Sequence, residues 1–303
     1  MKAFVGITDW DWFELLSNQS GLDDVNFWQP SGTRIFRVLN PGELFLFKLH
    51  SPRNFIVGGG FFAHSTILPI SLAWESFGVA NGAKTFREMR ERVAKYRHET
   101  ADRISDYSIG CILLEQPFFL PENLWIPIPS DWSPNIVQGK SYDLTAEPGR
   151  SLWVALQTTM TITAQEPTER SRYGTPVLVT PRLGQGSFRV VVTDAYERRC
   201  ALTNEKTLPA LEAAHIRPYS ENGEHKVENG ILLRRDLHAL LDRGYITITP
   251  SLEIEVSRRI KEEFENGKDY YRLHGSRMRA PSDKAKHPDS EHLKWHNEHI
   301  YLG

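Results

Sequence analysis

The residues best suited to chemistry lie in one segment of the 303-residue chain, Cys200 to Thr247. His215 ends a short apolar stretch, Asn229 lies just before a second one, and His238 follows Asn229 by nine positions (238 − 229 = 9). A neutral histidine can take a proton from water near pH 7. Histidine, amide and carboxylate groups can also hold a divalent cation. These residue types therefore suit metal-assisted hydrolysis.

The elements that must position these residues are predicted as a strand, a loop, a second strand and a helix. In that order they are Leu211 to Ile216, Arg217 to Gly223, Ile231 to Leu233 and Arg235 to Arg243. A turn at Asn229-Gly230 precedes the second strand, and Gly244 is placed to end the helix. His215 is thus expected on the first strand and His238 on the helix.

This order and spacing resemble the HNH nuclease family. Its pattern is a histidine ending strand one, an asparagine opening strand two and a histidine nine residues later in a helix. Four blocks carry the resemblance in order: GQGSFR at 184–189, RCALT at 199–203, LEAAHIRPY at 211–219 and LHALLDRG at 237–244. The resemblance covers roughly Val177 to Gly275. It implies a ββα-metal nuclease domain that hydrolyses phosphodiester bonds in DNA.

The resemblance also implies a role for each residue of the motif. His215 would be the general base and His238 a metal ligand. Asn229 would either ligate the metal or orient the catalytic histidine through its amide. The cofactor would be a divalent cation, Mg²⁺ or Mn²⁺. Many family members have an Asp or His ligand directly before the base, but here that residue is Ala214, which cannot ligate.

Two carboxylates near the motif could complete the metal site. Residues 212 and 214 of a strand face the same way, so Glu212 could replace the missing ligand. Asp242 lies one helical turn after His238 and could be a further ligand or have a structural role at the helix end. The sequence does not decide between Glu212 and Asp242.

Other residues around the motif are given simpler roles. Some HNH proteins hold a structural zinc with two CxxC pairs, but Thr203 stands where a cysteine would follow Cys200. We therefore expect no structural zinc and a small core role for Cys200. Arg217 and Arg234 are expected to contact DNA phosphates. His225, in the loop, is expected to be solvent-exposed.

Composition limits the remaining function classes only weakly. The formal net charge of −2 gives no global signal for nucleic acid, although a local patch can still bind phosphates. There is no run of about 18 apolar residues, so we expect no membrane span. Asp9 and Asp11 near the N-terminus argue against a signal peptide, and two cysteines cannot form a disulfide framework. These observations favour a cytoplasmic protein.

The chain is predicted to be α+β, with a reading domain at 1–144, a polar linker at 145–176 and the nuclease domain at 177–303. The first half contains strand-like runs, including Leu44 to Leu49, and a glycine run at Gly58 to Gly60. Its segments Pro41 to Leu49 and Asn54 to Gly60 loosely resemble the PUA superfamily, and within it the EVE-like domains that read modified bases in DNA. This resemblance implies a small β-barrel with flanking helices.

A domain that reads a modified base needs an aromatic pocket, because an extruded base can stack on aromatic rings. The candidates in the first half are Trp10, Trp12, Trp28 and Trp74. A tryptophan in a β-rich domain is more often part of the core. Both interpretations therefore remain open for each of the four.

Three functions follow from the sequence. The leading hypothesis is a modification-dependent restriction endonuclease that cuts double-stranded DNA containing 5-methyl- or 5-hydroxymethylcytosine. The second is an HNH endonuclease whose first domain reads sequence or structure, and the third is a DNA-binding protein with a decayed nuclease site. A double-strand break would need a homodimer or two sequential cuts.

Overall fold

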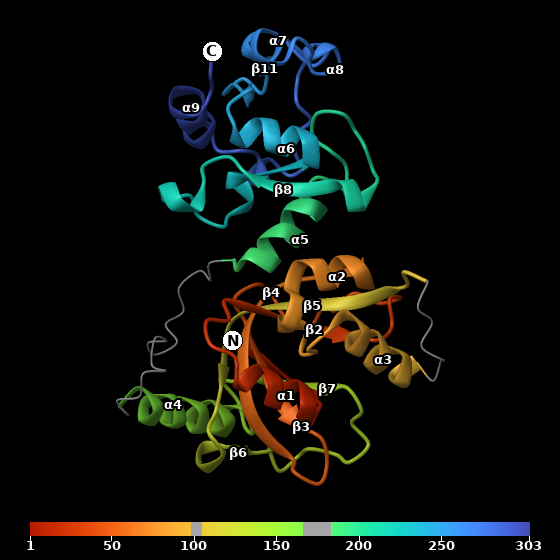
Figure 1. Ribbon diagram of the computed structural model, residues 1–303. Helices are drawn as coiled ribbons and strands as arrows, with labels where there is room; N and C mark the ends of the chain where they lie inside the picture. The colour runs from red at the N-terminus through yellow and green to blue at the C-terminus, as the bar shows by residue number, and fades with distance from the viewer. Residues whose placement is uncertain (98–104, 166–182) are drawn as a thin grey trace. The chain divides into compact units, whose positions relative to one another are not determined.

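The computed structural model describes residues 1–97, 105–165 and 183–303. The chain divides into two compact units, Met1–Leu183 and Gly184–Gly303 (Figure 1). Both units combine helices and strands, which confirms the expected α+β class. Among the described residues, no helix is long and apolar enough to cross a membrane.

The first unit is built on a seven-stranded sheet in the order β2-β5-β4-β3-β1-β7, with β6 paired to β4. The strands are β1 (Lys2–Thr8), β2 (Asp24–Gln29), β3 (Leu44–Leu49), β4 (Phe55–Pro69), β5 (Ser108–Phe119), β6 (Ile126–Pro127) and β7 (Gly139–Asp143). Only β1 and β3 run parallel among these pairs. In the described part of the chain, β2 and β7 are the two ends of the pairing path.

The glycine run lets β4 lie against strands on both sides. A Cβ at Gly58 would lie 2.3 Å from the carbonyl oxygen of Phe118, and one at Gly59 would lie 2.7 Å from that of Phe45. The register with β5 shifts between Gly59 and Phe61. The run therefore provides both the close backbone approach and the irregularity that its sequence predicts.

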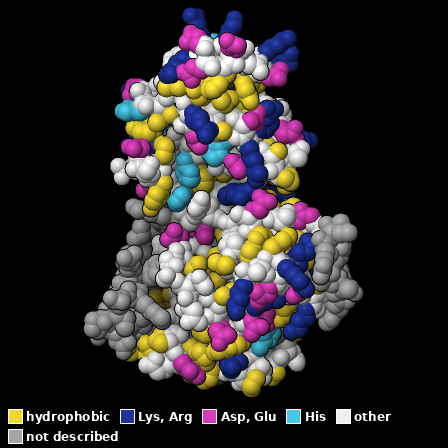
Figure 2. Space-filling view, in the orientation of Figure 1, with side chains coloured by type: hydrophobic (Ala, Val, Ile, Leu, Met, Phe, Trp, Pro, Cys, Tyr) yellow, Lys and Arg dark blue, Asp and Glu magenta, His cyan; other side chains and the backbone are white. Residues whose placement is uncertain are grey.

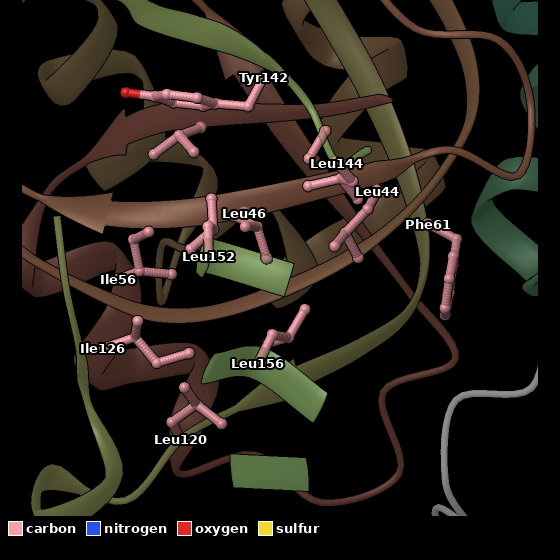
Figure 3. Packing of buried hydrophobic residues seen from close by; sticks show 12 residues of the cluster. Leu44, Leu46, Ile56, Phe61, Leu120, Ile126, Tyr142, Leu144, Leu152 and Leu156 are labelled. Carbon is pink, nitrogen blue, oxygen red and sulfur yellow. The ribbon is translucent and has the colours of Figure 1, made fainter. Parts of the chain in front are cut away.

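In the described part of the first unit, four α-helices accompany this sheet: α1 (Trp10–Ser17), α2 (Ile70–Phe77), α3 (Phe86–Arg97) and α4 (Gly149–Gln165). The last of them lies within the predicted linker. Its Leu152 and Leu156, one turn apart, are each 4% exposed and belong to a core cluster with Leu46 and Ile56. Figure 3 shows these side chains directed toward one another. Residues 149–165 thus form part of the first unit, whereas residues 166–176 of the predicted linker lie outside the described residues.

The second unit contains the predicted strand, loop, strand and helix. Its elements are α5 (Gln185–Ala195), β8 (Leu211–His215), β9 (Gly230–Arg234), α6 (Arg235–Asp242), β10 (Ile246–Ile248), β11 (Ile254–Val256), α7 (Arg259–Phe264), α8 (Lys268–Tyr271) and α9 (Ser290–His299). The antiparallel pair β8–β9 lies between α5 and α6 (Figure 1). Gly244, just after α6, has the positive φ of +74° expected of a helix-ending glycine.

Candidate active site

His215 is held at the end of β8 by an aromatic ring from α5. Its imidazole stacks on Phe188 with ring centroids 4.0 Å apart and an interplanar angle of 8°. The residue opposite His215 in the strand pair is Gly230. A Cβ at Gly230 would lie 2.5 Å from Val192 Cγ2 and 3.0 Å from Phe188 Cζ. The absence of a side chain at Gly230 therefore allows α5 to approach and place Phe188 on His215.

The surroundings of His215 keep its imidazole neutral. Burial, followed by charge repulsion from nearby His225 and His238, lowers the pKa of His215 from 6.5 to about 4. At pH 7 the ring can therefore accept a proton. This is the protonation state that a general base requires.

His225 lies against His215, which corrects the expectation that it is solvent-exposed. It is half-buried, and its Nδ1 lies 2.9 Å from Nε2 of His215. Tyr219 stacks on the other side of His225 with an interplanar angle of 13°. The sequence places His225 in a loop but contains no signal for how that loop closes, so this contact was missed.

Asn229 organises the loop that carries His225. The backbone N–H of Arg217 donates to its Oδ1 (2.9 Å), and its Nδ2 donates to the carbonyl oxygens of Arg217 (2.9 Å) and Glu224 (3.0 Å). Its own carbonyl accepts from the N–H of Ile216 (3.0 Å). The side chain is fully buried. The amide of Asn229 therefore binds backbone groups of the loop, and its role, as a metal ligand or as the group that orients the catalytic histidine, stays a prediction.

The structure brings Glu212, His238 and Asp242 together. Nδ1 of His238 lies 3.0 Å from Oε2 of Glu212, and its Nε2 lies 3.3 Å from Oδ2 of Asp242. Arg235 forms an ion pair with the other oxygen of Glu212 (3.0 Å). Ala214, at the position where many family members have a ligand, is fully buried.

Imidazole nitrogen and carboxylate oxygens are donors that suit Mg²⁺ or Mn²⁺. In the arrangement described, the two carboxylates lie against opposite nitrogens of His238. No three His, Cys, Asp or Glu side chains of the described residues converge on one point. The donor types therefore fit a divalent cation, and these side chains would have to exchange their mutual contacts for contacts with it.

The two arginines predicted to contact phosphate differ in their partners. The guanidinium of Arg217 lies 5.0 Å from the ring centre of Trp295, and its Nε donates to the carbonyl of Glu221 (2.6 Å). Arg234 makes two hydrogen bonds to Asp236, and these bonds, together with its charge, lower the pKa of that carboxyl. Asp236 partly compensates the charge of Arg234, so Arg217 is the better phosphate candidate.

Comparison with known families agrees with this geometry. Residues 200–249 match a family model described as HNH endonuclease, and this segment includes His215, Asn229 and His238. The second unit contains an HNH endonuclease domain. This HNH domain gives the chain its enzyme class, that of a nuclease.

Two solved structures also resemble the chain, both at low sequence identity. ASCH from Zymomonas mobilis matches the first half of the chain with 11% sequence identity and a TM-score of 0.34. The match covers 51% of this chain and 94% of the ASCH chain. A modification dependent restriction endonuclease, TagI, matches with 11% sequence identity and a TM-score of 0.29. This match covers 93% of this chain and 77% of the TagI chain. No curated protein matches the sequence. The assignment of the HNH domain therefore rests on the family match and on the geometry of the site.

The second unit carries mixed charge on the face drawn in Figure 2. Figure 2 shows histidine side chains of the second unit among lysine, arginine and acidic side chains on the face drawn. Cys200, in the same unit, is buried and free. Burial of this thiol agrees with the small core role expected for it.

In the first unit, two of the four candidate tryptophans have structural contacts. Trp12 is 4% exposed, and its ring centre lies 4.9 Å from that of Phe47, so Trp12 is a core residue rather than the wall of an open pocket. The indole N–H of Trp28 donates to the carbonyl of Asn81 (2.9 Å). These two indoles stabilise the packing of the first unit.

The other two tryptophans are half-buried and lie in different environments. The guanidinium of Arg53 lies 3.9 Å from the ring centre of Trp10, and Trp74 lies beside Phe86. Among the described residues, no recorded ring contact joins Trp10, Trp12, Trp28 and Trp74 to one another. The four therefore do not form one aromatic cluster.

Glu115 is a buried acid of the first unit that sequence reasoning did not single out. Its side chain is 1% exposed on β5, where its register partner on β2 is Asp24. Burial, followed by repulsion from Asp24, raises the pKa of Glu115 to about 7. An alternating strand pattern predicts which face a residue occupies, but it does not reveal that two acids lie side by side.

Proposed function

We propose that this chain is a modification-dependent restriction endonuclease. The first unit binds double-stranded DNA that carries a modified cytosine, such as 5-methyl- or 5-hydroxymethylcytosine, and the HNH domain hydrolyses a phosphodiester bond nearby. The observation that carries the nuclease part is the neutral His215 imidazole, fixed on Phe188 in the same small domain as the Glu212–His238–Asp242 cluster.

In the proposed reaction, His215 accepts one proton of a water molecule. The water oxygen forms a bond to phosphorus, the bond from phosphorus to one sugar oxygen breaks, and that oxygen leaves as an alkoxide that takes a proton from solvent water. Glu212, His238 and Asp242 would hold a divalent cation, Mg²⁺ or Mn²⁺. When bound, such a cation would stabilise the negative charge that develops on the phosphate oxygens and on the leaving sugar oxygen. Arg217 contacts a neighbouring phosphate and positions the backbone.

The proposal for the first unit depends on base flipping, which exposes a small mark that is otherwise hidden in the stacked duplex. Trp10 is the best remaining candidate of the four tryptophans, because it is half-buried and its ring already contacts a cation, Arg53. Trp28 and Trp74 are secondary candidates. Trp12, which is buried, would support the pocket from the core.

A cleavage assay on one plasmid in three forms tests both halves of the proposal. The forms are unmodified, 5-methylcytosine-containing and 5-hydroxymethylcytosine-containing, each with and without Mg²⁺ or Mn²⁺. We expect cleavage of modified DNA only, and only with metal. Equal cleavage of all three forms would retain the nuclease and contradict the modified-base reader, in favour of a reader of sequence or structure.

A further inference from the structure

His215 has a hydrogen-bonded neighbour outside the three-residue motif. Nε2 of His215 and Nδ1 of His225 lie 2.9 Å apart, so one of these nitrogens donates a proton and the other accepts it. The remaining ring nitrogen of His215, Nδ1, has no hydrogen-bond partner recorded among the described residues. The contact with His225 therefore bears on which nitrogen of His215 carries the proton.

Aromatic rings on both sides keep the two imidazoles in place. Phe188 covers one face of His215 at 4.0 Å, and Tyr219 stacks on His225 with ring centroids 4.9 Å apart. The ring centroids of Phe188 and His225 also lie 5.6 Å apart. The row of rings restricts rotation of either imidazole, so the contact between them is built into the packing.

The loop between β8 and β9 fixes the position of His225 along the chain. Asn229 binds both backbone groups of Arg217 at the start of this loop and the carbonyl of Glu224, the residue before His225. These bonds set the path of the segment that carries His225. Asn229 therefore acts on His215 through the loop and through His225.

We propose that His225 is a positioning residue and proton acceptor for the catalytic base, a role that rests on the proposed function of His215. Nδ1 of His225 accepts the Nε2–H of His215, which leaves the lone pair on Nδ1 of His215 to face water. When His215 takes the water proton on Nδ1, it passes the Nε2 proton to Nδ1 of His225. His215 is then neutral again, and His225 carries the positive charge.

The energetics of His215 support this transfer. Because burial holds the pKa of His215 near 4, the ring retains an added proton poorly at neutral pH. A second imidazole at hydrogen-bond distance provides a place for the charge without loss of the stacked geometry. In metal sites and catalytic sites, partners of this kind determine the tautomer of the histidine that they contact.

Two matched substitutions of His225 separate the hydrogen bond from the ring stacking. His225→Asn retains a side-chain oxygen that can accept from His215 but removes the ring. His225→Phe retains the ring between Tyr219 and Phe188 but removes the acceptor. We expect both variants to lower kcat by about 10- to 100-fold with KM nearly unchanged, because the Asn oxygen accepts the hydrogen bond of His215 but cannot take up its proton.

The protonated nitrogen of His215 can be read independently in the full-length, metal-free protein. Two-bond ¹⁵N–¹H correlation spectra of the imidazoles distinguish the two tautomers without DNA. We expect the Nε2–H tautomer in the wild type and in His225→Asn, and a mixture of tautomers in His225→Phe. An Nδ1–H tautomer in the wild type, or an unchanged spectrum and unchanged kcat in His225→Phe, would overturn the proposal.

The imidazole spectrum and the plasmid assay together show whether the role of His225 or the proposed nuclease function fails. If the wild type shows the Nε2–H tautomer but cuts none of the three plasmid forms, the nuclease proposal fails while the positioning of His215 by His225 stands. If the wild type cuts modified DNA but His215 has the other tautomer, the nuclease stands and His225 has a different role.

Discussion

In both units, the pKa of a buried titratable residue depends on the side chains that pack against it. His215 loses affinity for its proton because it is stacked on Phe188 and half-buried, and Glu115 gains affinity because it is buried next to Asp24. Both effects arise from burial, but they have opposite signs because burial disfavours the charged form of each group. For Glu115 the consequence is a cost to stability at high pH.

The first prediction concerns Glu115. Its pKa is raised from 4.5 to about 7, so the folded state favours the protonated acid and loses stability as pH rises through this range. Glu115→Gln should increase the free energy of unfolding near pH 8 by on the order of 2–3 kcal/mol and change it little near pH 4. Chemical denaturation at both pH values measures this, with exposed Glu122→Gln as the control. An equal effect at both pH values would contradict the account.

Residue types and spacing allowed part of the site to be predicted. Local spacing placed His215, Asn229 and His238 on the correct elements, because it depends only on strand and helix periods. It could not show that Asn229 binds backbone groups or that His225 reaches His215. Those contacts depend on how a loop closes, and several closures are compatible with the same residues.

At the scale of elements, the β8–β9 pair and helices α5 and α6 form the frame of the HNH centre. The strand–loop–strand–helix pattern was predictable because short apolar runs and turn residues mark each boundary. The residues of helix α4 were instead assigned to the linker, because their sequence is rich in Thr and Gln. The contribution of Leu152 and Leu156 to the core becomes clear only in the folded unit.

The second prediction tests whether α4 belongs to the first unit. Leu156→Ala should lower the free energy of unfolding by about 2–5 kcal/mol, because it leaves a cavity among buried side chains. Val154 lies on the same helix but is 54% exposed, so Val154→Ala is the matched control and should change stability by less than about 0.5 kcal/mol. Similar small effects for both variants would show that α4 does not contribute to the core.

The third prediction concerns the approach of α5 to β9. Gly230→Ala would place a Cβ 2.5 Å from Val192 Cγ2. We expect a loss of about 1–3 kcal/mol in stability and a slower cleavage rate, because Phe188 would shift from His215. Adding Val192→Ala removes the clashing methyl group and should restore part of both. A Gly230→Ala protein with wild-type stability and rate would show that the close approach is not required.

At the scale of the whole molecule, the two units are proposed to divide recognition from hydrolysis. The chain has a formal net charge of −2, so binding to DNA would depend on local groups such as Arg217 rather than on the overall charge. This division predicts that preference for modified DNA and the rate of cleavage can be altered separately.

The fourth prediction follows from this division. Trp10→Ala should lower the preference for modified over unmodified plasmid by about five- to a hundredfold, the range expected for loss of one base–aromatic stack. Metal-dependent cleavage at saturating DNA should be retained. The exposed Val137, also in the first unit, provides the control Val137→Ala. An unchanged preference in Trp10→Ala would exclude Trp10 from the pocket.

The central claim, that His215 is the base of an HNH nuclease, is tested most directly by comparing the wild type with His215→Ala on 5-methylcytosine-containing plasmid in the presence of Mg²⁺ or Mn²⁺. Gel-shift binding of the same DNA is measured in parallel. We predict that the variant loses about a hundredfold to ten-thousandfold in cleavage rate and binds the DNA as the wild type does. Wild-type cleavage by His215→Ala would contradict the assignment, and a joint loss of binding and cleavage would show that His215 is structural.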